Sequence, residues 1–189
     1  KQVDEGLYSR QLYVYGHEAQ RKMQSASVLI IGMRGLGIEI AKNVVLAGVH
    51  AVSILDNTPV QVADLGSNFY LRPSDIGKVT RGKASLQQLS TLNPYVEVKA
   101  VSAEVNEELI KQYSVVVVTG ETISKQVQIN KWCRAHNISF ISSDTQGLLL
   151  SIFVDNGPSH TIADADGNQC LRGLISHIEN TNPMIITTS

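Results

Sequence analysis

The stretch Ser27–Asn57 places a glycine-rich turn between two apolar runs, and this arrangement most constrains what the chain can fold into. Val28–Ile31 is a short apolar run of strand type that ends at Gly32, and an apolar segment with helical spacing follows. A second apolar run, Ala51–Leu55, ends at Asp56. The order strand, glycine turn, helix, strand and acid predicts the first βαβ unit of a dinucleotide-binding type of fold.

The glycine turn departs from the usual fingerprint at its middle position. The pattern Gly-x-Gly-x-x-Gly is present at Gly32 and Gly37, but Arg34 occupies the place between them and Gly35 stands beside it. The outer glycines serve the sharp turn and the close helix packing, whereas the middle one lets the backbone approach a pyrophosphate. The sequence therefore predicts the dinucleotide-binding type of fold without its phosphate-binding position. The residues alone leave one alternative open, in which Arg34 beside a helix N-terminus recruits phosphate.

Composition and charge narrow the class of protein. The chain has 189 residues, of which 43% are hydrophobic and 17% charged, and this is typical of a soluble globular domain with a substantial core. Basic and acidic residues nearly balance, at 16 and 17, so we expect no nucleic-acid partner and no attraction to anionic lipid. No apolar run approaches the ~18 residues of a membrane span, and the start KQVDEG does not resemble a signal peptide. Because the sequence does not begin with methionine, we expect it to be a fragment.

Two cysteines lie far apart in the sequence, with no CxxC motif and no histidines at ligand spacing. This favours reduced thiols in a cytosolic or nuclear protein. Cys133 falls within a helical pattern, which predicts a core position, and Cys170 follows a Gly-Asn turn without an evident partner.

Helical and strand-like patterns alternate along the rest of the chain. We expect helices over residues 7–21, with a break at Gly16, and over 80–92, 107–113 and 124–136. We expect strands over residues 96–101, 115–119 and 139–143, and one helical turn in the loop 57–70. The alternation predicts an α/β fold: a doubly wound, mostly parallel Rossmann-like sheet with helices on both faces.

The pattern changes beyond Thr145. A strand over 148–154, a turn over 155–159 and a strand over 160–163 predict a hairpin, and strands over 171–178 and 184–188 predict the start of a small β-rich domain. We therefore divide the chain into residues 1–163 and 164–189. Asp164, Asp166 and Asn168 have the spacing of a calcium loop, but Ile175 stands where such a loop needs glutamate, so we expect no metal there.

Long motifs of this chain resemble the ubiquitin-activating enzymes, and within them the N-terminal, non-catalytic adenylation half. The resemblance is in LYSRQLYVYG, IGMRGLGIEIAKNVVLAGV, LDNTPVQVADLGSNFYLRPSDIGK, LNPYV and SSDTQGLLLSIFVDNG, and it follows nearly the whole chain in order. It implies an enzyme that adenylates the C-terminal glycine of a ubiquitin-like protein with MgATP. It also implies that two copies of this fold pair face to face, and that one of them has lost its nucleotide site.

The resemblance implies that this chain is the copy that lost the site. Asp56 matches the acid that holds the ribose, but Ser67 replaces a phosphate-binding arginine and Thr80 replaces a lysine, with Lys78 and Lys83 close by. Residues 120–122, Gly-Glu-Thr, replace an Asp-Asn pair that binds Mg²⁺. We expect no cofactor and no metal bound by this chain itself, with MgATP used by the complete enzyme. The degenerate site comprises Gly32, Arg34, Gly35, Gly37 and Asp56.

Arg10 is the candidate catalytic residue. From the residues alone, a solvated arginine and a contact with a partner are equally open. The resemblance implies that Arg10, in Tyr8-Ser9-Arg10-Gln11, reaches across the paired halves to the ATP phosphates of the other half, as an arginine finger does. It further implies that residues 164–189 open the first catalytic-cysteine half-domain, and that neither Cys133 nor Cys170 forms the thioester.

The expected function is thus the non-catalytic adenylation half of a ubiquitin-activating enzyme, silent by itself. The expected partners are the active half, ubiquitin and, through the full-length protein, ubiquitin-conjugating enzymes, in the cytoplasm and the nucleus. Two alternatives stay open: the corresponding subunit of a SUMO- or NEDD8-activating heterodimer, and an active adenylating or NAD-dependent Rossmann enzyme. The β-rich segment entered at Asp164 speaks against the heterodimer.

Overall fold

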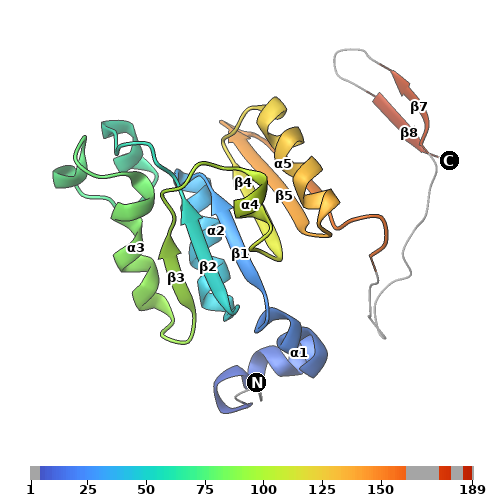
Figure 1. Cartoon of the computed structure of the whole chain (residues 1–189), viewed down its shortest axis with the longest axis horizontal. Coiled ribbons are helices and arrows are strands. Elements are labelled where there is room, and N and C mark those ends of the chain that lie inside the picture. The colour runs from blue at the N-terminus through green and yellow to red at the C-terminus, as the bar shows by residue number, and fades with distance from the viewer. Residues whose placement is uncertain (1–4, 161–174, 180–184, 189) are drawn as a thin grey trace. The chain divides into compact units, whose positions relative to one another are not determined.

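The computed structural model describes residues 5–160, 175–179 and 185–188 (Figure 1). The chain divides into two compact units, Lys1–Ser159 and His160–Ser189. The domain boundary expected between residues 163 and 164 lies in a stretch outside the described residues and stays a prediction.

The first unit is built on a six-stranded sheet in the order β3-β2-β1-β4-β5-β6. The strands are β1 Ser27–Ile31, β2 Ala51–Leu55, β3 Glu97–Ala100, β4 Val115–Thr119, β5 Ser139–Gln146 and β6 Leu149–Asp155. Strands β1 to β5 run parallel, and β6 pairs antiparallel with β5 at one edge. Because β1 pairs with both β2 and β4, the strand order reverses between β1 and β4. The predicted doubly wound, mostly parallel sheet is confirmed.

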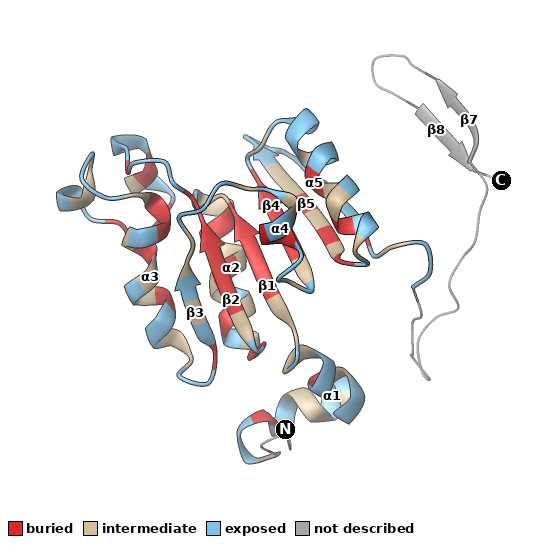
Figure 2. Ribbon diagram, viewed as in Figure 1, coloured by how far each residue is buried: buried red, intermediate tan, exposed pale blue. Residues whose placement is uncertain are grey.

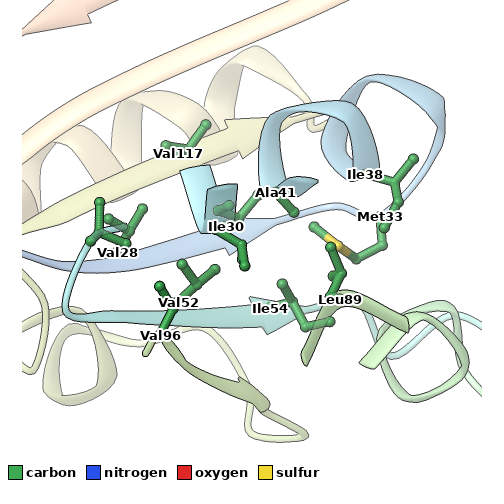
Figure 3. Close-up of a cluster of buried hydrophobic side chains, with 12 residues drawn as sticks. Val28, Ile30, Met33, Ile38, Ala41, Val52, Ile54, Leu89, Val96 and Val117 are labelled. Carbon is green, nitrogen blue, oxygen red and sulfur yellow. The ribbon is translucent and has the colours of Figure 1, made fainter. Parts of the chain in front are cut away.

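Helices cover both faces of this sheet. They are α2 Gly35–Ala47, α3 Arg81–Leu92, α4 Glu107–Ile110 and α5 Ile123–Ala135. Helix α1 Glu5–Met23 precedes β1, and 3₁₀ turns lie at Val62–Gly66 and Pro73–Asp75. Alternate residues of β1 point to opposite faces, so that Ile30 packs with α2 and α3, and Leu29 packs with α4 and α5. Figure 2 shows the buried residues concentrated in the central strands, and Figure 3 shows the cluster formed with α2 and α3.

Local signals explain where several helices end or break. Gly48 follows α2 in a left-handed conformation with φ of 81°, and its N–H donates to Val45 O, as is common at a helix C-terminus. Thr80 caps α3 by accepting a hydrogen bond from Lys83 N–H. Helix α1 is broken at Gly16, where φ is 77° and ψ is 170°, and this confirms the predicted break.

The hairpin that follows Thr145 differs from the one expected. It joins β5 to β6, with Gln146 paired to Leu149 across a two-residue turn. Gly147 has a φ of 61°, which suits the first central position of such a tight turn. The strand expected over 148–154 is present as β6, but it is preceded by a hairpin that the sequence did not predict, because the strand that begins at Ser139 extends to Gln146 and turns back at Gly147. The hairpin expected through residues 155–159 stays a prediction. Residues 161–163, expected as its second strand, lie outside the described part of the chain.

The second unit contains a two-stranded antiparallel sheet of β7 Ile175–Glu179 and β8 Ile185–Thr188. These strands overlap the two that we predicted over 171–178 and 184–188. Cys170 and the Asp164–Asn168 turn lie outside the described residues. In the stretches that the structure describes, no helix combines the length and apolar character needed to cross a bilayer.

Candidate functional site: a pocket where the strand order reverses

A cavity of about 940 Å³ opens at the carboxyl ends of the central strands. Ile31 of β1, Leu55 of β2, Thr119 of β4 and Asp144 of β5 contribute to its wall. Parallel α/β sheets bind ligands at this place, outside the strand ends where the order reverses, and the volume suits a small-molecule ligand. The position of the predicted site is therefore a real cavity.

The two outer glycines of the turn are required by packing. Gly32 has a φ of 92°, and a Cβ there would lie 2.3 Å from the carbonyl oxygen of Thr119. A Cβ at Gly37 would lie 1.8 Å from the carbonyl oxygen of Gly32. No side chain fits at either place, so the strand, the turn and α2 can approach each other only with glycine.

The N-terminus of α2 faces the pocket beside Arg34 and Gly35. Arg34 is the N-cap residue, but it makes no side-chain cap, and the first turn of α2 carries no acidic residue. A Cβ at Gly35 would lie 2.8 Å from the Cβ of Ser67, so the loop after β2 passes close over this turn. The Arg34 side chain is exposed and has no acidic partner among the described residues. An open helix N-terminus and an unpaired cation both favour an anion.

Asp56 is held by its own chain. Its Oδ2 accepts a hydrogen bond from Met33 N–H at 2.9 Å, and its Oδ1 accepts one from Thr58 N–H at 2.9 Å. The Nη1 of Arg81 lies 3.5 Å from the same Oδ2, and the Asp56 side chain is buried. Both carboxylate oxygens are thus engaged in joining the glycine turn, the loop after β2 and the start of α3.

Arg81 is the residue of this site that sequence reasoning missed. It is the first residue of α3, it is buried, and it lines the pocket. Its Nε donates to Oδ2 of Asp64 at 2.7 Å, and its backbone N–H donates to Thr58 O at 2.9 Å. A basic residue just after a helix N-cap is usually solvated, so the sequence offered only its position as a signal.

The residues considered for the role of a phosphate-binding lysine do not line the pocket. Thr80 caps α3, while Lys78 and Lys83 are exposed and do not line the pocket. The cation that α3 contributes to the pocket is therefore Arg81.

Residues 120–122, between β4 and α5, take part in an ion pair within the chain. Glu121 lines the pocket, and its Oε1 lies 2.7 Å from the Nζ of Lys125 one turn further on in α5. Asp144 of the neighbouring strand β5 also lines the pocket and accepts a hydrogen bond from Thr145 N–H. Over residues 5–160 and the two later strands, no group of three histidine, cysteine or acidic side chains is arranged to hold a metal ion.

Arg10 does not belong to this pocket. It is an exposed residue of α1, and the residues that line the cavity do not include it. Helix α1 leads into the start of β1, so it lies at the amino ends of the strands, whereas the pocket lies at their carboxyl ends (Figure 1). Any phosphate that Arg10 contacts must come from another molecule or another domain.

Cys133 is part of the core. It is fully buried in α5 among residues such as Ile129 and Phe140. Burial, and to a lesser extent the charge of Asp155, raise the pKa of its thiol to about 12. A thiol in this state is not a nucleophile at neutral pH, and the predicted core position is confirmed.

Comparison with known proteins places the chain in a family. The model of the ThiF family matches residues 8–184. This chain belongs to the ThiF family. Escherichia coli MccB, in its crystal structure with succinimide, shares the fold of this ThiF-family chain with a TM-score of 0.68 and 18% identity, over 80% of this chain and 49% of MccB.

Curated relatives of this ThiF-family chain are ubiquitin-activating enzymes. It is 43% identical over 185 residues to ubiquitin-like modifier-activating enzyme 1 of Homo sapiens, which is 98% of this chain and 17% of the relative. It is 47% identical over 176 residues to ubiquitin-activating enzyme E1 1 of Schizosaccharomyces pombe, which is 93% of this chain and 17% of that enzyme. The resemblance of the sequence motifs to ubiquitin-activating enzymes is confirmed, and the chain spans less than a fifth of the length of these relatives.

Proposed function

We propose that this chain is the non-catalytic adenylation half of a ubiquitin-activating enzyme. It pairs with the active half, which adenylates the C-terminus of ubiquitin with MgATP before thioester transfer. The observation that carries this proposal is that Asp56 and Arg81 of the pocket are bound within the chain. Each oxygen of Asp56 accepts a backbone N–H, Oδ2 also lies 3.5 Å from Arg81, and Arg81 is bound in turn to Asp64.

The charges of the pocket support a site without triphosphate. Arg81 lies between two carboxylates, and Lys125 is paired with Glu121, so these cations are already neutralised. Among the described residues that line the pocket, Arg34 remains as the one cation without an acidic partner. Transfer of a triphosphate from water into a cleft requires several cations or a metal ion to offset its desolvation.

An exposed apolar surface supports the pairing with another half. Edge strand β6 exposes apolar side chains on both of its faces, and the turn residue Leu148 is fully exposed. Helix α1 adds Tyr13, Val14 and Tyr15, all exposed. An apolar strand at the edge of a sheet and an exposed aromatic patch are features of surfaces that another protein covers. We propose that the active half covers them.

Arg10 supplies the contribution of this half to the chemistry. Its exposure and its distance from the pocket of its own domain support a role in trans. Attack of a carboxylate on the α-phosphate develops negative charge, and a guanidinium placed there stabilises it. Ubiquitin and ubiquitin-conjugating enzymes bind the full-length protein, in the cytoplasm and the nucleus.

The first test is a calorimetric titration of the purified chain with MgATP, with NAD in parallel. We expect no heat of binding from either ligand, and tight MgATP binding would overturn the proposal. The variant Arg34→Gly restores the glycine fingerprint and serves as a matched probe. We expect it to stay silent, because Arg81 and Lys125 keep their carboxylate partners.

The second test is Arg10→Ala in the full-length enzyme. We expect slower ATP–pyrophosphate exchange with an unchanged unfolding temperature. Arg21→Ala is the control, since Arg21 is an exposed arginine at the other end of the same helix. Exchange that is unchanged by Arg10→Ala contradicts the role in trans.

One observation favours an active nucleotide-binding enzyme as the second candidate. The cavity is open, and the N-terminus of α2 faces it beside the unpaired Arg34. In that case Arg34→Gly weakens MgATP binding instead of leaving the titration silent.

A further inference from the structure

We propose that Tyr8 and Gln11 are positioning residues, which hold the beginning of α1 against the C-terminus of α2. These contacts set the direction in which the Arg10 side chain projects from the domain. The inference rests on the proposed role of Arg10 in trans. It adds the part of the fold that holds that arginine in place.

The segment that carries Arg10 is separated from the rest of α1. Tyr8 has non-helical angles, with φ of −104° and ψ of 16°, and Gly16 breaks the helix with φ of 77° and ψ of 170°. The residues between these breaks form a short helix, and helices shorter than about 12 residues are marginal without packing. The second part of α1 therefore does not fix the orientation of this short helix, and contacts with the rest of the domain must fix it.

Tyr8 makes the first of these contacts, against Gly48. The Tyr8 side chain is buried although its neighbours Ser9 and Arg10 are exposed. A Cβ at Gly48 would lie 2.6 Å from the Tyr8 hydroxyl oxygen and 2.7 Å from its Cε1. The ring thus lies directly on the bare Cα of Gly48, the residue that ends α2 with a φ of 81°. Glycine is required there twice, by its backbone conformation and by the tyrosine ring.

Gln11 makes the second contact, one turn further along. Its Nε2 donates to the carbonyl oxygen of Ala47, the last residue of α2, over 3.3 Å. The last carbonyls of a helix have no partner within the helix, so this bond satisfies one of them. Both contacts fall on the C-terminus of α2, and they flank Arg10 in the sequence. Arg10 itself is left exposed on the short helix that they fix.

Loss of the Tyr8 and Gln11 contacts should reduce the rate acceleration that Arg10 provides, without removing its guanidinium. A group displaced by about 1 Å from its productive position can lose as much as about 100-fold in rate. Tyr8→Ala removes the ring from Gly48. Tyr8→Phe keeps the ring, and the Tyr8 hydroxyl makes no hydrogen bond within the described residues, so this variant should behave as the parent. Gln11→Glu keeps the side-chain shape, removes the donor and places a negative charge at the negative end of α2.

The experiment measures ATP–pyrophosphate exchange in the full-length enzyme for these variants, alone and combined with Arg10→Ala. We expect Tyr8→Ala and Gln11→Glu each to lower the exchange rate about tenfold, in the same kinetic parameter that Arg10→Ala lowers, and Tyr8→Phe to retain it. In the Arg10→Ala background we expect neither variant to lower the rate further, because coupled residues are not additive. Tyr95→Ala is the matched control, since it removes an exposed tyrosine ring before β3.

The outcomes separate this inference from the proposed function. If Arg10→Ala leaves exchange unchanged, the role in trans fails first. If Arg10→Ala slows exchange but Tyr8→Ala and Gln11→Glu do not, Arg10 acts in trans and the contacts of Tyr8 and Gln11 with α2 do not position it. If both lower the Arg10→Ala rate as strongly as the parent rate, their effect is general destabilisation, and the positioning role is overturned. Gln11→Glu leaves the tyrosine ring in place, so the test stands even if Tyr8→Ala does not fold.

Discussion

The guanidinium Nε of Arg81 donates to the carboxylate of Asp64 over 2.7 Å, and both side chains are buried. Asp64 also accepts a hydrogen bond from Gln61 N–H, and the other side of the guanidinium faces Asp56. This cluster joins three parts of the pocket wall: the turn after β1, the loop after β2 and the first turn of α3. It explains how a nucleotide-binding scaffold can keep its acid and a cation while directing both inward.

Arg81→Met is predicted to destabilise the chain strongly. The substitution leaves two buried carboxylates without their cation, and breaking such a cluster from one side costs about 3–5 kcal/mol. The measurement is the free energy of unfolding in urea. Lys83→Met, two residues further along α3 and exposed, should change it by less than about 0.5 kcal/mol. Equal effects of the two variants would contradict the proposed importance of the cluster.

The stability of the first unit is predicted to depend on the ionisation of Asp155. The hydrogen bond from Arg134, then those from Asn130 and from Gly157 N–H, lower the pKa of Asp155 from 3.8 to about 2. Because the pKa in the folded state is lower than in the unfolded state, the stabilisation is fully present above about pH 5 and is lost as the pH falls toward 2. Urea unfolding between about pH 2 and about pH 6 measures it, with those limits chosen to span about two units on each side of the unfolded pKa. Asp155→Asn should flatten this dependence, and Glu104→Gln, at an exposed position, should not.

Cys133 is predicted to resist alkylation in the folded chain. Its thiol is buried and its pKa is raised to about 12, so both access and the thiolate are missing at neutral pH. Treatment with iodoacetamide followed by peptide mass spectrometry reports Cys133 separately from Cys170. We expect labelling of Cys133 in urea and little labelling in buffer. Rapid labelling under native conditions would show that α5 opens easily.

Gly37→Ala is predicted to cost more than about 2 kcal/mol of folding stability, as expected for a forced clash in the core. The new Cβ would meet the carbonyl oxygen of Gly32 at 1.8 Å, and a backbone atom cannot rotate away. Gly66→Ala is the matched control, because nothing lies within 4 Å of a Cβ at that position. Thermal unfolding of both variants compares them, and a Gly37→Ala variant as stable as Gly66→Ala would contradict the packing argument.

Sequence reasoning predicted the sheet better than the site. The spans of β2 and β4 match the apolar runs that predicted them, because a strand buried on both faces leaves a continuous signal. The hairpin at Gly147 was missed because the last residues of β5, 144–146, are polar and resemble a loop, so the predicted strand ended at Ser143. The partner of Asp56 was missed for a different reason. An acid after the second strand has the same appearance in a sequence whether it meets a ribose or an arginine from a distant helix.

The cavity follows from the topology of the sheet. It exists because the chain leaves β1 toward one side of the sheet and β4 toward the other, and this divergence leaves a hollow between the two connections. The hollow is therefore a by-product of chain topology, and it does not depend on which side chains line it. Under the proposed function, nucleotide binding would require new side chains on an unchanged backbone, which makes the chain a natural starting point for engineering a second active centre.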